Sequence, residues 1–90
     1  MHAKFSREIT RMKRIEGQAR GIVRMMEEER YCIDVLQQLS AIEAAIRAAK
    51  SKVLEIHAAH CIEDAIKSGD AEDQREKFRE LVDLFEKVGR

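Results

Sequence analysis

The chain has 90 residues, which is enough for one small domain that buries only a modest share of its surface, so oligomerisation is expected. Lys and Arg together number 17, as do Asp and Glu, and this balance excludes a simple polycation. With no Pro and four Gly, the composition predicts an all-α single domain over residues 1–90. No signal peptide or long apolar run is apparent, so we expect a cytoplasmic protein without a membrane segment.

The first predicted helix begins after Ser6, a candidate N-cap, and runs to about Glu29. Its apolar residues recur at steps of three and four and form one stripe: Ile9, Met12, Ile15, Ala19, Ile22, Val23 and Met26. Residues 1–24 carry seven basic and two acidic side chains. A local basic face on a neutral protein either binds nucleic acid or is simply solvated, and charge alone does not decide between the two.

A second predicted helix begins near Tyr31 or Cys32 and ends near Gly69, a plausible C-cap position. Alternating steps of four and three give it a coiled-coil-like seam, formed by Val35, Leu39, Ile42, Ile46, Ala49, Val53, Ile56 and His60. A third helix, capped by Asp70 or Asp73, is expected to run to about Val88. The sequence therefore predicts three helices with a long second one.

Two cysteines and one histidine share a face of the second predicted helix. Cys32 and Cys61 are 29 residues apart, or about 44 Å along the axis of one helix. On an ideal wheel they and His57 fall within about 40° of one another, and His57 and Cys61 are an i, i+4 pair. Two such helices packed antiparallel bring Cys32 of one chain to His57 and Cys61 of the other. We therefore expect an antiparallel dimer with two identical inter-chain sites.

This antiparallel arrangement predicts a register. Opposing residues have indices that sum to about 93, which places Cys32 opposite Cys61 and Leu36 opposite His57. The same register pairs Leu39 with Leu54, and Glu43 with Lys50.

Two thiolates and one imidazole suit soft or borderline metals such as Cu(I) and Zn(II). Three ligands without an evident fourth favour trigonal Cu(I), because zinc needs a fourth ligand for a closed tetrahedral site. Tyr31 either donates a hydrogen bond to this site or packs at the start of the helix. His60 is rotated about 100° from Cys61, so we expect it beside the site or in the seam rather than as a ligand. A cysteine taken alone is more often a small buried hydrophobe.

Three segments closely resemble the CsoR/RcnR family of bacterial repressors: residues 11–25 with the run Arg-Ile-Glu-Gly-Gln, residues 31–41, and His57-Ala-Ala-His-Cys61. That run is specific in combination with the spacing Cys-x(24)-His-x(3)-Cys. The resemblance implies an all-helical dimer that pairs into a homotetramer and binds operator DNA without a helix-turn-helix. It also implies that Cys32, His57 and Cys61 bind Cu(I) as inducer, and that Cu(I) binding releases the DNA.

The residues expected to contact DNA are basic or polar. Four of them recur at steps of four, three and four on one face of the first helix, and two more extend the basic surface: Arg7, Arg11, Arg14 and Gln18, then Arg47 and Lys50. Phosphate contacts from such residues give affinity with a steep salt dependence. Some of these groups could instead form ion pairs within the chain.

Other members of the family sense other inducers. Nickel and cobalt sensors typically place His where Cys61 stands and recruit an N-terminal His, which His2 could supply. Formaldehyde sensors share Cys32 and His57 but use an N-terminal Pro, and persulfide or thiol-reactive sensors usually lack the His. Cys61 departs from the nickel and cobalt pattern, and His2 departs from the N-terminal Pro of formaldehyde sensors. His57 favours copper over persulfide or thiol chemistry.

An alternative of another class is a copper-buffering helical protein without DNA binding. An enzyme is not expected, because the sequence shows no acid/base pair in an evident pocket and no phosphate loop.

Overall fold

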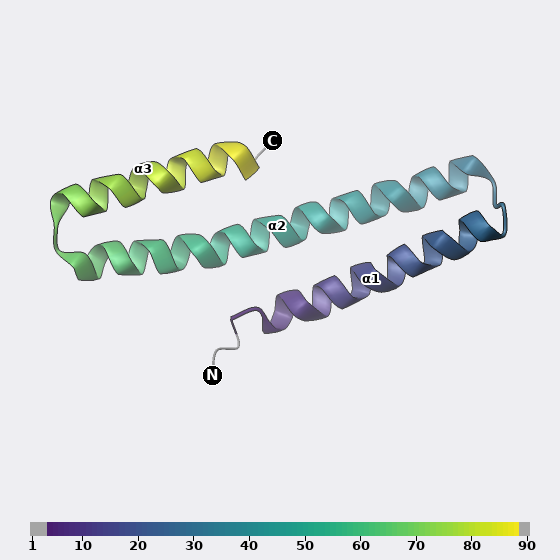
Figure 1. Ribbon diagram of the computed structural model, residues 1–90, viewed down its shortest axis with the longest axis horizontal. Helices are drawn as coiled ribbons and strands as arrows, with labels where there is room; N and C mark the ends of the chain where they lie inside the picture. Colours follow the sequence, from purple (N-terminus) through teal and green to yellow (C-terminus); the bar gives the residue numbers. More distant parts are fainter. Residues whose placement is uncertain (1–3, 89–90) are drawn as a thin grey trace. The chain divides into compact units, whose positions relative to one another are not determined.

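The computed structural model describes residues 4–88, and these residues form three helices and no strand. Helix α1 spans Ser6–Glu27, α2 spans Cys32–Ser68 and α3 spans Ala71–Val88 (Figure 1). The all-α class with a long second helix is thus confirmed. None of these helices combines the length and the apolar character needed to cross a bilayer. The chain divides into two compact units, Met1–Ala49 and Lys50–Arg90.

The first unit contains α1 and the first part of α2. The prediction that Ser6 caps α1 is wrong, because Ser6 is already the first helical residue. Phe5 occupies the N-cap position without a side-chain capping bond, and its carbonyl accepts from the amide of Ile9 at 2.7 Å. The buried apolar side chains of this unit are Ile15, Ile22 and Ala49.

Helix α1 ends at Glu27, two residues before its predicted end, and the turn to α2 begins at Glu28. Glu28 caps the helix, and Glu29 has a φ of 53°. This is the left-handed region, which a residue with a Cβ rarely adopts. The amides of Glu28 and Arg30 donate to the carbonyls of Arg24 and Met25, both at 2.9 Å, so these two carbonyls in the last turn of α1 are satisfied.

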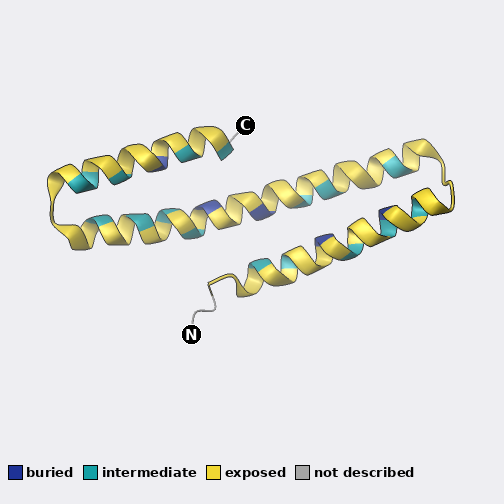
Figure 2. Cartoon of the chain, in the orientation of Figure 1, coloured by how far each residue is buried: buried dark blue, intermediate teal, exposed yellow. Residues whose placement is uncertain are grey.

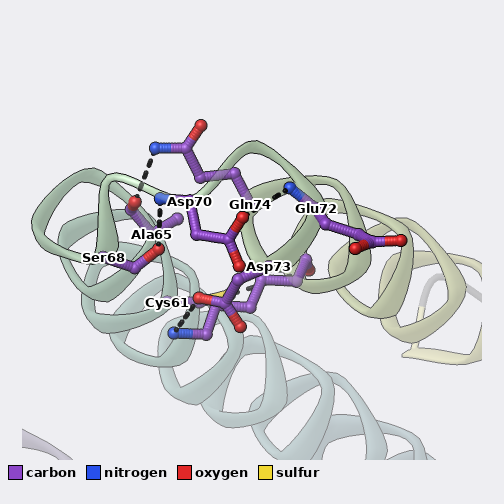
Figure 3. A network of polar contacts seen from close by, with 8 residues as sticks. Cys61, Ala65, Ser68, Asp70, Glu72, Asp73 and Gln74 are labelled. Carbon is purple, nitrogen blue, oxygen red and sulfur yellow. Dashed lines mark hydrogen bonds and ion pairs between the residues drawn. The ribbon is translucent and has the colours of Figure 1, made fainter.

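The second unit contains the rest of α2 and α3, joined by a tight corner. α2 ends as predicted before Gly69, whose φ of 65° suits glycine. Of the two predicted caps of α3, Asp70 is the one observed: its Oδ1 accepts from the amide of Glu72 at 3.3 Å (Figure 3). The amide of Asp70 in turn donates to Ser68 Oγ at 3.1 Å. These local bonds set the direction in which α3 leaves the corner.

Few side chains are buried in a single chain. Leu54 and Leu81 are the buried apolar residues of the second unit, and most of each helix surface is exposed (Figure 2). The exposed large apolar residues of this unit lie on both helices: Val53, Ile62, Ile66, Phe78, Val82 and Phe85. Large exposed apolar surfaces of this kind are typical of protein interfaces.

Candidate functional site

Cys32 is a free cysteine at the first position of α2, and its side chain is exposed. The carbonyl of Tyr31 accepts from the amides of Asp34 and Val35 at 3.0 and 3.2 Å, so Tyr31 precedes the helix as its N-cap residue. Its side chain is exposed, and its hydroxyl makes no hydrogen bond with any other residue in the range 4–88. The start of α2 therefore presents both a thiol and a phenol to solvent.

Cys61 is also free, but it is half-buried against α3. Its thiol donates a long, weak hydrogen bond to the carbonyl oxygen of Lys77, with Sγ and oxygen 3.8 Å apart. His57, one turn before Cys61 on α2, is exposed, as is His60. The structure thus places an imidazole and a thiol on neighbouring turns, with the sulfur held by α3.

The described part of a single chain does not assemble a metal site. No group of three or more His, Cys, Asp or Glu side chains within residues 4–88 is close enough to hold a metal ion. His2 lies outside the described residues. The donor types of Cys32, His57 and Cys61 fit a soft metal, but the described part of one chain does not bring the three together.

The residues that the register assigns to the inter-chain contact differ in exposure. Leu36 is 56% and Leu39 38% exposed, so both keep apolar surface for a partner. Leu54 is only 9% exposed within its own chain and adds little to such a contact. It belongs to a row on α2, formed by Leu54, Ala58, Cys61 and Ala65, whose last two members bond to α3.

The six candidate DNA-contacting residues remain available for an external partner. Five are exposed and one, Arg11, is half-buried; the exposed ones are Arg7, Arg14, Gln18, Arg47 and Lys50. None of the ion pairs formed within residues 4–88 includes any of them. The side chain of Arg11 leaves its buried Nε atom without a partner there. The alternative that these charges serve ion pairs within the chain therefore has no support in this structure.

The second unit has an ion pair on α2, between Lys52 and Glu55, and another at the start of α3. Lys77 Nζ lies 3.2 Å from Asp73 Oδ2, one turn earlier on the helix. The Ser68 hydroxyl and the Lys77 ammonium hold the pKa of Asp73 below its ordinary value of 3.8. Asp73 is therefore charged at neutral pH and helps fix Lys77, the residue whose carbonyl meets Cys61.

Comparison with known proteins extends over nearly the whole chain. The copper-sensing transcriptional repressor CsoR of Bacillus subtilis is 53% identical over 77 residues, which cover 86% of this chain and 73% of the relative. The crystal structure of the copper-sensing repressor CsoR with Cu(I) from Geobacillus thermodenitrificans superposes with a TM-score of 0.78 at 42% identity, over 100% of this chain and 91% of that one. The nickel-responsive transcriptional regulator InrS gives a TM-score of 0.74 at 32% identity, over 89% of this chain and 90% of its own.

The model of one protein family matches residues 6–87, and its description is metal-sensitive transcriptional repressor. This match spans all three helices and confirms the resemblance seen in the sequence, as well as the expectation that the protein is not an enzyme. The chain belongs to the family of metal-sensitive transcriptional repressors.

Proposed function

We propose that this protein is a repressor that binds operator DNA in the cytoplasm and releases it when Cu(I) binds. The ligands are Cys32 of one chain and His57 and Cys61 of its partner. The observation that carries the proposal is that both thiols of α2 are free, while the described residues of one chain assemble no three-ligand site. The copper-sensing relatives supply the identity of the metal.

The inter-chain site requires an oligomer, and the exposed area supports one. Large apolar side chains on α2 stay exposed in one chain, among them Leu36, Ile46 and Ile66. Exposed apolar surface of this kind is typical of protein interfaces. Pairing of α2 with an antiparallel copy, and of two dimers into a tetramer, would cover much of this surface.

The proposed residues form two sets with different roles. Arg7, Arg11, Arg14 and Gln18 on α1, with Arg47 and Lys50 on α2, face the phosphates of double-stranded DNA. In the other state, the two thiolates and the imidazole join two chains through the metal. Copper thereby favours the conformation that binds DNA less well and shifts the population away from the operator.

The test pairs two histidines on the same turn of α2. His57→Ala should bind the DNA upstream of its own gene like the wild type but release it poorly with stoichiometric Cu(I), whereas His60→Ala should respond normally. Tyr31→Phe, which removes only the hydroxyl, tests whether that group supports the site. Fluorescence anisotropy with labelled DNA measures each response. Normal copper release by His57→Ala would contradict the assignment of the site.

Nickel sensing is the second candidate, because a nickel-responsive regulator is among the structural neighbours. Cys61 argues against it, since thiolates select Cu(I) over harder ions. The same anisotropy assay with Ni(II) in place of Cu(I) separates the two, and only the metal that releases DNA at one equivalent per chain is the inducer.

A further inference from the structure

Two hydrogen bonds join α2 to α3 on neighbouring turns of the second unit. The side-chain amide of Gln74 donates to the carbonyl oxygen of Ala65 at 2.9 Å, and the thiol of Cys61 donates to the carbonyl oxygen of Lys77 at 3.8 Å (Figure 3). Cys61 and Ala65 are four residues apart on α2, and Gln74 and Lys77 are three apart on α3, so each pair shares one helix face. The two bonds are therefore adjacent cross-links between the same two helices.

The two cross-links differ in strength. A thiol is a weak donor, so the bond from Cys61 cannot by itself fix the position of α3. The bond from Gln74 has the ordinary length of a good amide–carbonyl bond. On the far side of Lys77, the next turn of α3 is anchored by the buried Leu81. Gln74 and Leu81 thus hold α3 on either side of the Lys77 carbonyl, in addition to the corner bonds that set the direction of the helix.

The contact between Cys61 and α3 belongs to the metal-free protein. A thiol that binds a metal gives up its proton to solvent and can no longer donate to the Lys77 carbonyl. Any interaction that holds α3 in this position therefore favours the arrangement in which the Cys61 sulfur contacts the Lys77 carbonyl and binds no metal. The position of α3 is therefore coupled to metal binding at Cys61 through the hydrogen bonds between α2 and α3.

We infer that Gln74 is a positioning residue that restrains Cys61 in the metal-free protein. It touches neither the metal nor the sulfur, and acts by holding the Lys77 carbonyl against Sγ one turn away. The restraint on the thiol is a property of one chain and stands without the proposed function. Its consequence for copper affinity rests on the proposed inter-chain site.

The first test measures the thiol in metal-free full-length protein. Cys61 also lines an apolar hollow of about 400 Å³ beside Phe78 and Leu81, so a small uncharged reagent such as N-ethylmaleimide can reach it. In a Cys32→Ala background only Cys61 reacts. Gln74→Met, which keeps the length but removes the donor, should raise the rate at fixed pH by about twofold, the lower end of the range for one hydrogen bond, because the thiol is a weak donor. Gln37→Met, the same change at an exposed site on α2, should leave the rate unchanged.

The second test measures Cu(I) affinity by chelator competition with both cysteines intact. Gln74→Met should bind Cu(I) about twofold more tightly, because the bond released is weak, while its metal-free DNA affinity stays at the wild-type value. Gln74→Lys, which keeps a donor of similar reach, should restore wild-type reactivity and affinity. A purely structural role predicts the opposite result, weaker metal and DNA binding together.

The outcomes separate this inference from the proposed function. An unchanged N-ethylmaleimide rate in Gln74→Met overturns the restraint even if copper still releases DNA. If the rate rises and Cu(I) affinity does not, the restraint on the thiol holds and its link to metal binding is overturned. A failure of the proposed site shows instead in His57→Ala, which would then bind Cu(I) like the wild type.

Discussion

Mixing two inactive variants tests directly whether the ligands come from two chains. Cys32→Ala and Cys61→Ala each destroy both proposed sites of a homodimer. In a mixed dimer, one site receives both substitutions and the other site receives none, because each site takes Cys32 from one chain and Cys61 from its partner. Mixing should therefore restore copper binding that neither variant has alone.

The size of the recovery follows from the two-fold symmetry. Random pairing of equal amounts makes half of the dimers mixed, and each mixed dimer retains one intact site. The mixture should bind about one quarter of a Cu(I) ion per chain, against about one for the wild type. The variants are refolded together under reducing conditions, and tight copper is counted by competition with a chelator that removes loosely held metal.

The matched control mixes Cys61→Ala with His57→Ala. These substitutions lie on the same half of the proposed site, so every mixed dimer has both sites damaged and no tight copper is expected. Equal recovery in the two mixtures would refute the inter-chain arrangement. So would the absence of recovery when Cys32→Ala and Cys61→Ala chains are shown to have exchanged.

Two further predictions concern DNA binding and acid stability. Arg14→Ala should weaken DNA binding and lower the slope of log affinity against log salt by about 0.9 for each phosphate that the variant no longer neutralises. Lys13→Ala, on another face of α1, should leave both the affinity and the slope nearly unchanged. Equal effects of the two variants in anisotropy titrations over several salt concentrations would count against the proposed DNA face. Because the pKa of Asp73 is lowered in the folded state, its contribution to stability is present above its ordinary pKa of 3.8 and is lost as pH falls through the lower folded value. Asp73→Asn should therefore be less stable than the wild type to urea at pH 7, and this difference in stability should disappear in acid. Asp83→Asn, at an exposed position, should show no such trend. A difference for Asp73→Asn that persists unchanged at low pH would contradict the ion pair between Asp73 and Lys77.

The helices could be predicted from the sequence because their ends carry local signals. Gly69 ends α2 and Asp70 caps α3, and both effects depend on residues within one turn. The prediction that Ser6 caps α1 rested on the same kind of local signal, because serine is a favoured N-cap residue. It failed because the turn at residues 4–5 makes Phe5 the N-cap residue. The early end of α1 follows from the left-handed backbone of Glu29, which glutamate does not signal.

The surroundings of Cys61 could not be predicted in the same way. The bond from its thiol ends on a backbone carbonyl, and every residue of α3 has one, so no side-chain pattern singles out Lys77. Leu54 shows a related limit. Apolar residues occur on several faces of α2, and their spacing does not say whether α3 or another chain covers a given row. The sequence predicts which residues carry the chemistry, and the structure shows which neighbour contacts one of these candidates, Cys61.

The position of Cys61 on α2 allows it to contact either α3 or a partner chain. A helix places residues 100° apart, so a residue at the edge of one apolar row also borders the next. Cys61 lies one turn after His57 on the proposed ligand face of α2. It also belongs to the row formed by Leu54, Ala58, Cys61 and Ala65, which contacts α3. A sulfur at this border can bond to α3 or to a metal shared with a partner chain, but as a hydrogen-bond donor it cannot do both. Metal binding at the edge of α2 would therefore act on α3 without any change in the helix that carries the ligand.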